Sequence, residues 1–161
     1  MEFTLKIKPH HLLDYLYDLA VNNRHDEPNP FDNKNGELCR DFMDGKVTKI
    51  IFTPGVDDIC KPCKKLENGR KCTDIFDDET TKYYGYRFKQ DFNYQLDIKL
   101  NAALPDVFVF EKEQDILTVL ENLTLYLTND IINLYLWKRP DREKNTFSGI
   151  EKALIIYRNN N

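Results

Sequence analysis

The sequence predicts a single α+β domain that is mostly helical, with a small sheet and a cysteine-rich metal-binding loop. The chain has 161 residues, a common size for one domain. Apolar residues recur at helical spacing in several long segments and alternate in only short ones. Three of the four cysteines lie close together in a stretch of turn-forming residues. We therefore expect residues 1–161 to form one domain, in which residues 1–76 carry a histidine-bearing helix and the cysteine loop and residues 77–161 are mainly helical.

Two strands and two helices are expected in the first half of the chain. Phe3, Leu5 and Ile7 alternate with polar residues, as in a half-buried strand. Pro9 follows at a place that suits the first position of a helix, and leucines recur after it at helical spacing. The expected elements are a strand over residues 3–7, a helix over Pro9–Val21, a polar loop over Asn22–Gly36, a short helix through Leu38–Met43 closed by Gly45, and a strand over Val47–Thr53.

Helical spacing dominates the second half of the chain. Asp77 and Asp78 suit a helix cap, and apolar residues at spacing four favour a helix up to Leu100. The residues from Phe92 to Leu100 also alternate strictly, which fits a strand, and we favour the helix. The further elements expected are a brief strand over Val107–Phe110, a helix from Ile116 to Leu127, its continuation over Ile131–Trp137, and a last helix over Phe147–Tyr157.

The aromatic run from Tyr83 to Tyr94 is expected to belong to the core, because aromatic residues at helical or alternating spacing usually pack inside. Trp137 is expected to close the core under the last helices. His25 lies in the polar loop and is expected to be exposed to solvent.

Composition narrows the functional classes. With 23 basic and 27 acidic residues the net charge is -4, which gives no electrostatic footprint for nucleic acid or an anionic membrane. The chain begins without the features of a secretory signal, and no apolar run approaches the roughly 20 residues of a transmembrane helix. We expect a cytoplasmic protein of bacterial or archaeal type, with a redox or protein partner that the sequence does not identify. Disulfides are rare in that reducing compartment, so the clustered thiols are expected to be metal ligands or redox groups.

The main chemical signal is the spacing of Cys60, Cys63 and Cys72. A Cys-x-x-Cys pair allows two thiolates on one tight turn to reach the same metal centre. Asn68 and Gly69 form a turn signal that folds Cys72 back towards the pair. The basic residues of the loop are expected to lower the thiol pKa values and to offset thiolate charge. These residues are Lys61, Lys64, Lys65, Arg70 and Lys71.

Three thiolates leave a fourth ligand position to be filled. Cys39 is one candidate, although its spacing from Phe42 and Met43 also fits a residue that faces the core. Other candidates are His10, His11 and Asp14, which share an edge in the first turns of the first helix, and a ligand from outside the protein. The free N–H groups and positive dipole of that helix end favour an anionic thiolate cluster docked against it.

Two stretches of these residues resemble the DUF1284 family of bacterial and archaeal proteins, which are uncharacterised and described as iron-sulfur binding. They are Ile7–Leu13, with Pro9-His10-His11, and Gly55–Cys63 followed by Cys72; the resemblance covers Leu5 to about Phe76. It implies a cluster held by three loop cysteines and one from the helix. The family pattern places that cysteine at position 14, where this chain has Asp14. The resemblance therefore implies that either Asp14 or Cys39 completes the site, and carboxylate is the harder, more exchangeable donor.

Three functions are compatible with these residues. The first is an iron-sulfur protein, with a 4Fe-4S cluster as the natural form for four ligands. The second is a structural zinc protein in which the metal folds the loop and presents an interaction surface. The third is a metal-dependent hydrolase that uses the His10, His11 and Asp14 group with the acidic pair Asp57-Asp58, although these two residues also suit a turn that caps backbone N–H groups. The sequence leaves open whether the protein is an enzyme.

Overall fold

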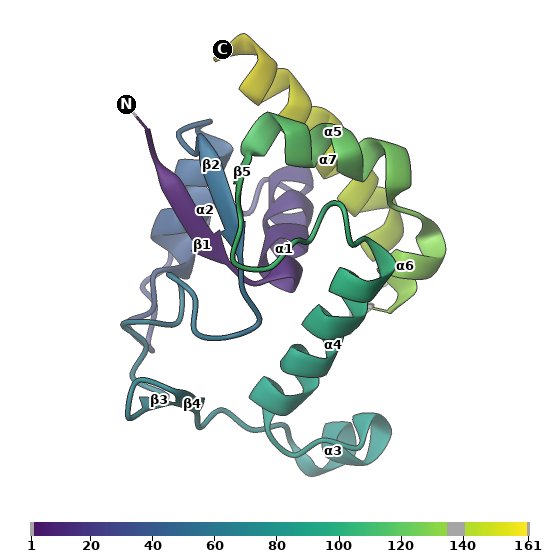
Figure 1. Ribbon diagram of the computed structural model, residues 1–161. Helices are drawn as coiled ribbons and strands as arrows, with labels where there is room; N and C mark the ends of the chain where they lie inside the picture. The colour runs from purple at the N-terminus through teal and green to yellow at the C-terminus, as the bar shows by residue number, and fades with distance from the viewer. Residues whose placement is uncertain (1, 135–140, 161) are drawn as a thin grey trace.

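The computed structural model describes residues 2–134 and 141–160, and it confirms a mostly helical α+β domain with a small sheet (Figure 1). The strands are β1 (Thr4–Ile7), β2 (Lys49–Phe52), β3 (Leu66–Glu67), β4 (Lys71–Cys72) and β5 (Glu113–Asp115). The helices are α1 (Pro9–Ala20), α2 (Asn35–Met43), α3 (Asp78–Tyr84), α4 (Lys89–Ala103), α5 (Ile116–Tyr126), α6 (Asn129–Asn133) and α7 (Arg142–Asn159). The expected first strand, first helix, second helix and second strand are therefore all confirmed, with ends that shift by a few residues.

The central sheet has the strand order β1-β2-β5. β1 and β2 pair in parallel, with Thr4 opposite Lys49 and Ile7 opposite Phe52. Parallel neighbours need a long crossover, and α1 and α2 supply it. β5 pairs antiparallel with β2, so the second half of the chain completes a sheet begun by the first half. The two parts of the chain thus share one sheet.

The strand expected over Val107–Phe110 is wrong. Val107 and Phe108 are buried, but their N–H groups bond the carbonyl oxygen of Leu104 in a turn that follows α4. Phe110 makes only an isolated bridge with Phe52. The edge strand is instead the polar segment Glu113–Asp115, which pairs through its backbone and has no apolar pattern to reveal it.

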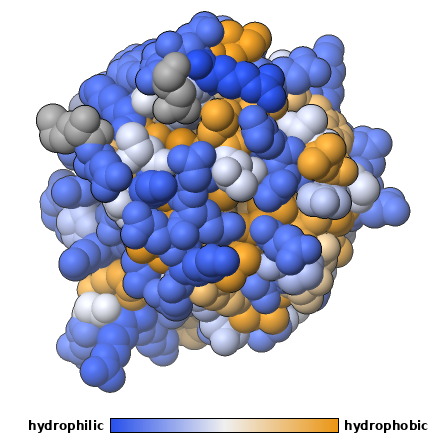
Figure 2. Space-filling view, turned by 45° about the horizontal axis from the view of Figure 1, so that its top comes forward, coloured by the Kyte–Doolittle hydropathy of each residue, from blue (hydrophilic) through white to orange (hydrophobic). Residues whose placement is uncertain are grey.

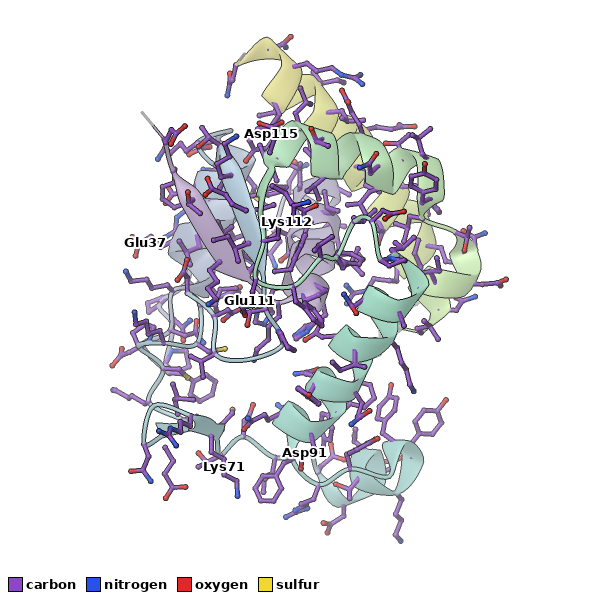
Figure 3. All side chains as sticks on the ribbon, viewed as in Figure 1. Glu37, Lys71, Asp91, Glu111, Lys112 and Asp115 are labelled. Atoms are coloured by element: carbon purple, nitrogen blue, oxygen red, sulfur yellow. The ribbon has the colours of Figure 1, made fainter. Side chains whose placement is uncertain are left out.

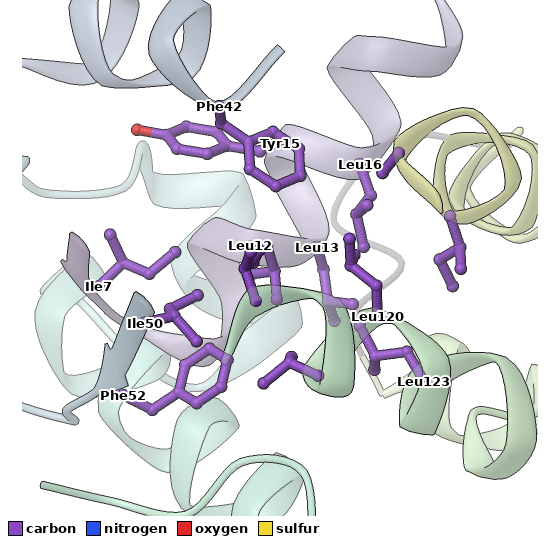
Figure 4. Close-up of a cluster of buried hydrophobic side chains, with 14 of the residues drawn as sticks. Ile7, Leu12, Leu13, Tyr15, Leu16, Phe42, Ile50, Phe52, Leu120 and Leu123 are labelled. Carbon is purple, nitrogen blue, oxygen red and sulfur yellow. The ribbon is translucent and has the colours of Figure 1, made fainter. Parts of the chain in front are cut away.

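α1 runs through the middle of the core. Its leucines face the sheet on one side and the C-terminal helices on the other (Figure 4). Burying each such side chain contributes about 1.5–3 kcal/mol. The residues that meet around α1 and are almost fully buried include Leu5, Ile7, Leu12, Leu13, Leu16, Ile50, Phe52, Leu120 and Leu123.

The preference for helix over strand from residue 77 to Leu100 is confirmed, but the segment forms two helices. Asp77 caps α3 as expected, because its Oδ1 atom accepts the N–H of Thr80 at 2.7 Å. α3 ends at Gly85, whose φ of 78° lies in the left-handed region that favours glycine. α4 then begins anew at Lys89.

The expectation that the aromatic run is core holds only in part. Tyr84, Phe92 and Phe76 pack together, with ring centroids 4.8–6.1 Å apart. Tyr83 and Tyr94 are exposed, because they lie on the outer faces of α3 and α4.

The last helices agree with expectation where they are described. α5 and α7 cover the helices expected at Ile116–Leu127 and Phe147–Tyr157, and α7 begins five residues earlier. The continuation over Ile131–Trp137 is a short α6 that ends at Asn133, and Trp137 lies outside the described residues. Among the described helices, none has the length and apolar content needed to cross a membrane. Figure 2 shows a face where hydrophilic side chains predominate and hydrophobic ones are scattered.

α1 and α7 approach unusually closely because Gly149 lies at their crossing. A Cβ atom built on Gly149 would lie 1.9 Å from the carbonyl oxygen of Leu16, which is backbone and has no room to move away. Glycine is therefore required at this crossing for steric reasons.

Gly149→Ala is expected to destabilise the protein by about 3 kcal/mol, the upper part of the usual cost of overpacking, even though alanine is the better helix former. The measurement is the free energy of unfolding in urea. Gly55→Ala serves as the control, because its added Cβ would meet only Thr53 Oγ1 at 3.5 Å. Equal stability of the two variants would contradict the close crossing.

Candidate metal centre

Cys60, Cys63 and Cys72 line one pocket of about 560 Å³. His11 and Asp14, from the first turns of α1, line the same pocket. The opposite wall is the polar loop between α1 and α2. The structure therefore brings five of the sequence-predicted site residues to one hollow, and leaves His10 and Cys39 outside its lining.

The cysteine loop is folded by two turns. The N–H of Cys63 bonds the carbonyl oxygen of Cys60 at 2.9 Å, which closes the Cys-x-x-Cys turn. Asn68 and Gly69 both have positive φ, 52° and 67°, and they lie in the turn that joins β3 to β4 as a hairpin. This confirms the turn expected at Asn68-Gly69. Figure 3 shows Lys71 of this hairpin in the same region as the start of α4.

Asp57 and Asp58 fasten the start of the loop to β1 and α1. Asp57 accepts the backbone N–H of Lys8 and of Cys60, each at 3.0 Å, and its Oδ2 atom lies 2.5 Å from His11 Nδ1. Asp58 accepts the N–H of Lys6 at 2.8 Å. Both acids therefore bind backbone N–H groups, as a turn-forming pair would, and Asp57 in addition orients the imidazole of His11.

Burial and charge set the protonation of this group. Burial alone would lower the pKa of His11, but the Asp57 carboxylate beside it outweighs burial and the net shift is upward. Burial likewise opposes the charged form of Asp57, yet the His11 imidazole and the Lys8 contacts hold its pKa well below the usual range. The pair behaves as an ion pair inside the protein, in which three donors hold the Asp57 carboxylate.

The expectation that basic neighbours lower the thiol pKa values is wrong for Cys60. Burial raises the pKa of Cys60 to about 12, and the nearby Asp57 carboxylate adds to this effect. Lys8, whose Nζ atom lies 3.9 Å from Cys60 Sγ, acts in the opposite direction but is outweighed. The lysines and arginines of the loop are largely exposed to solvent, where they influence the thiol less than burial does.

Cys60 and Cys72 also line a second, smaller hollow of about 140 Å³. Three basic side chains line it too, those of Lys8, Arg70 and Lys89. Cys72 is tied to α4 because its N–H donates to Gln90 Oε1 at 2.7 Å. The two cysteines thus line two hollows that also share His11 and Asp74, whereas Lys8, Arg70 and Lys89 line only the smaller one.

Asp14 is held in place by a buried arginine. The Nη1 atom of Arg142 donates to Asp14 Oδ1 at 2.9 Å, and the guanidinium lies 5.0 Å from the ring centre of Tyr17. Arg142 is fully buried, whereas the side chain of Asp14 keeps about a quarter of its surface exposed. The carboxylate therefore has a fixed position at the pocket wall.

His10 has a separate, structural place. Its Nδ1 atom lies 2.9 Å from both carboxylate oxygens of Asp97 on α4, and its backbone N–H donates to the same carboxylate. Asp97 is fully buried. The start of α1 was expected to attract an anionic cluster, but the anions that meet its N–H groups are Asp97 and Asp57.

Cys39 is fully buried on α2 and lies with Asp18 and His25. Burial raises the pKa of Cys39 to about 12, with Asp18 as the next contribution. His25 was expected to be exposed, and this is wrong: its Nε2 atom lies 2.7 Å from Asp18 Oδ2, and only 26% of its side chain is exposed.

Sequence reasoning did not single out Asp18. The sequence feature that could have identified Asp18 is its spacing from His11 and Asp14, which places three polar residues on one stripe of an otherwise apolar helix.

The spacing of the thiols bears on the kind of metal centre. Among residues 2–134 and 141–160, only one group of three or more Cys, His, Asp or Glu has ligand atoms all within 4.8 Å of one another, namely Asp18, His25 and Cys39. The Sγ atoms of the three loop cysteines are therefore not all within 4.8 Å of one another. Two thiolates on a single tetrahedral zinc lie about 3.8 Å apart, given Zn–S bonds of about 2.3 Å.

Comparison with models of protein families, with curated proteins and with solved structures finds no match. The resemblance to the DUF1284 family therefore stays a prediction from the quoted motifs, and function is inferred from the geometry of the pocket.

Asp97→Ala is expected to destabilise the fold by about 3 kcal/mol, because it leaves the ring and the backbone N–H of His10 buried without their acceptor. Thermal and urea unfolding measure this loss. The matched control is Asp91→Ala on the same helix, an exposed residue (Figure 3) whose loss should cost less than about 0.5 kcal/mol. A small effect of Asp97→Ala would contradict the structural role given to His10.

Proposed function

We propose that the protein binds an iron-sulfur cluster through Cys60, Cys63 and Cys72, with Asp14 as the fourth ligand. The observation that carries this proposal is that the three thiols and the Asp14 carboxylate line one pocket of about 560 Å³. A structural zinc site in the same loop is the second candidate. The hydrolase alternative gains no support from the geometry, because His10 is engaged with Asp97 and Asp57 with His11 and backbone N–H groups.

The chemistry of the donors fits an iron-sulfur cluster. Cluster irons are held mainly by thiolates, and three are present on one loop. Thiolates bring negative charge, and two lysines are placed to offset it. Lys8 Nζ lies 3.9 Å from Cys60 Sγ. A hydrogen bond to Asp74 raises the pKa of Lys65, and the Cys72 and Cys63 thiols add to that shift, so Lys65 remains charged beside them.

The distances between the loop Sγ atoms, which are not all within 4.8 Å of one another, favour a cluster over a single zinc ion. In a 4Fe-4S cluster each thiolate bonds a different iron atom, so the cysteine sulfurs lie farther apart than on one metal ion. A zinc ion would require the three Sγ atoms to close to about 3.8 Å. The loop is fastened at Asp57 and at Gln90, which resists such a contraction.

Asp14 is the better fourth ligand because it lies on the pocket wall with the thiols, whereas Cys39 does not line the pocket. Arg142 holds one carboxylate oxygen of Asp14 and thereby orients the group. Such support by a second residue is typical of metal ligands. A bound cluster would supply single-electron transfer to a redox or protein partner.

Cys60→Ser, Cys63→Ser and Cys72→Ser are each expected to abolish most of the visible absorption and to reduce iron and acid-labile sulfide per chain, because hydroxyl is a poor ligand for cluster iron. The protein is purified without oxygen, and iron, sulfide and zinc are measured on the same sample. Cys39→Ser is the matched control and should retain the cluster. A colourless protein with one zinc per chain, lost in the three loop variants, would replace the proposal with the zinc alternative.

Asp14→Cys is expected to slow the loss of iron to a chelator severalfold, because a thiolate is the softer donor for cluster iron, and Asp14→Ala is expected to speed it. The measurement is the decay of visible absorption after a chelator is added. Identical decay in the unchanged chain and both variants, combined with cluster loss in Cys39→Ser, would assign the fourth position to Cys39.

A further inference from the structure

We propose that Asp18, His25 and Cys39 form a second metal site, which binds one divalent transition-metal ion of the zinc type and is separate from the loop cysteines. One carboxylate oxygen, one imidazole nitrogen and one sulfur atom lie within 4.8 Å of one another there. The second site does not require the loop to hold a cluster.

The distances and donor types suit such an ion. Bonds to zinc are about 2.3 Å for sulfur and about 2.0–2.2 Å for nitrogen and oxygen, so ligand atoms on one tetrahedral ion lie about 3.3–3.8 Å apart. Because the three atoms lie within 4.8 Å of one another, no distance has to shorten by more than about 1.5 Å to reach that spacing. The Asp18 Oδ2–His25 Nε2 distance, 2.7 Å, has to lengthen by about 0.6 Å. Sulfur, nitrogen and oxygen donors together suit zinc and its neighbours, and they do not suit magnesium or calcium.

A divalent ion would balance the charge that the group acquires when the Cys39 thiol gives up its proton to become a ligand. Cys39 is fully buried and Asp18 is 3% exposed. When such residues ligate a metal, one carboxylate and one thiolate together carry two negative charges, and a divalent cation neutralises both inside the protein. Buried charges are generally paired or bound to metal, because an isolated one is costly.

The ligands come from three segments that are fixed independently of any ion. Asp18 lies on α1 and Cys39 on α2, which pack against each other. The N–H of His25 bonds Asn23 Oδ1 at 3.2 Å, and Arg40 Nη1 donates to the His25 carbonyl oxygen at 2.7 Å. The backbone of His25 is thus held from both sides, with a positive φ of 54°, over the helix that carries Asp18.

The site has one open side. His25 lines the large pocket, and 26% of its side chain is exposed, whereas the other two residues are buried. Three protein ligands with access from a pocket are the arrangement in which zinc keeps its fourth position for water or a substrate. We therefore assign the fourth position to a small molecule that enters from the pocket.

The experiment uses the chain with Cys60→Ser, Cys63→Ser and Cys72→Ser, so that the loop contributes no thiolate. It is titrated with Co²⁺ without oxygen, and sulfur-to-cobalt charge transfer is followed in the near ultraviolet; Zn²⁺ binding is measured by calorimetry. We expect one ion per chain. Adding His25→Ala is expected to weaken binding by more than about tenfold, since even residues that only support a ligand change affinity on that scale.

Asp78→Asn on the same background is the control, because Asp78 is an exposed residue of α3 that pairs with Arg87 and belongs to none of the three ligand segments. The proposal is overturned if the folded triple variant shows no charge-transfer band, or if His25→Ala leaves the band and the affinity unchanged; the Asp18–His25 contact is then a structural fastening of the loop.

If circular dichroism shows that the triple variant does not fold, the test is His25→Ala in the otherwise unchanged chain. It must then lose one zinc per chain without losing iron or sulfide, and an unchanged zinc count overturns the proposal. Iron and sulfide report separately on the loop cluster.

Discussion

The structure depends on one constraint, which is that α1 has neighbours on nearly every side. The sheet, α2, α4 and α7 all contact it, so its leucines fill the core. His10 and Asp18 are buried as well, and His11 and Asp14 are half-buried. A buried polar group must be paired, or it costs several kcal/mol. Polar residues of the helix accordingly have partners from different segments. The pairs are His10 with Asp97, His11 with Asp57, Asp14 with Arg142 and Asp18 with His25.

These pairs join parts of the chain that are far apart in sequence and thereby place the pocket. His11 and Asp57 hold the start of the cysteine loop against α1, and Asp18 holds the polar loop that forms the opposite wall. Asp14 stands between these two contacts and is tied to the last helix. The same contacts that pair the polar side chains of α1 therefore bring thiol, imidazole and carboxylate groups around one hollow. Each pair thus has a structural role, and together the pairs place the groups on which the proposed metal centre depends.

Sequence patterns predicted the features that depend on near neighbours. Alternation predicted β1, and β-branched and apolar residues predicted β2. Helical spacing predicted α1, α5 and α7, and Asn68-Gly69 predicted the turn that folds Cys72 back. The predictions that failed concern features that depend on backbone pairing or on side chains far away in the sequence. β5 has no apolar pattern because it pairs at an edge, and the break at Gly85 depends on a single left-handed residue. The partners of His10, His11 and Asp14 lie 87, 46 and 128 positions away, so local spacing could not reveal which of these three faces the pocket.

The fastening of the cysteine loop has a consequence for the thermodynamics of ligand binding. Asp57 and Asp58 hold the segment before Cys60, and Gln90 holds Cys72. Most of the chain entropy of the loop is therefore lost during folding of the domain, before any ligand is bound. Small zinc domains are the opposite case, since their ligand orders an otherwise unfolded chain and binding energy appears as folding energy. A ligand of these thiols would instead meet a loop that is already closed, and its binding energy would appear mainly as affinity rather than as folding energy.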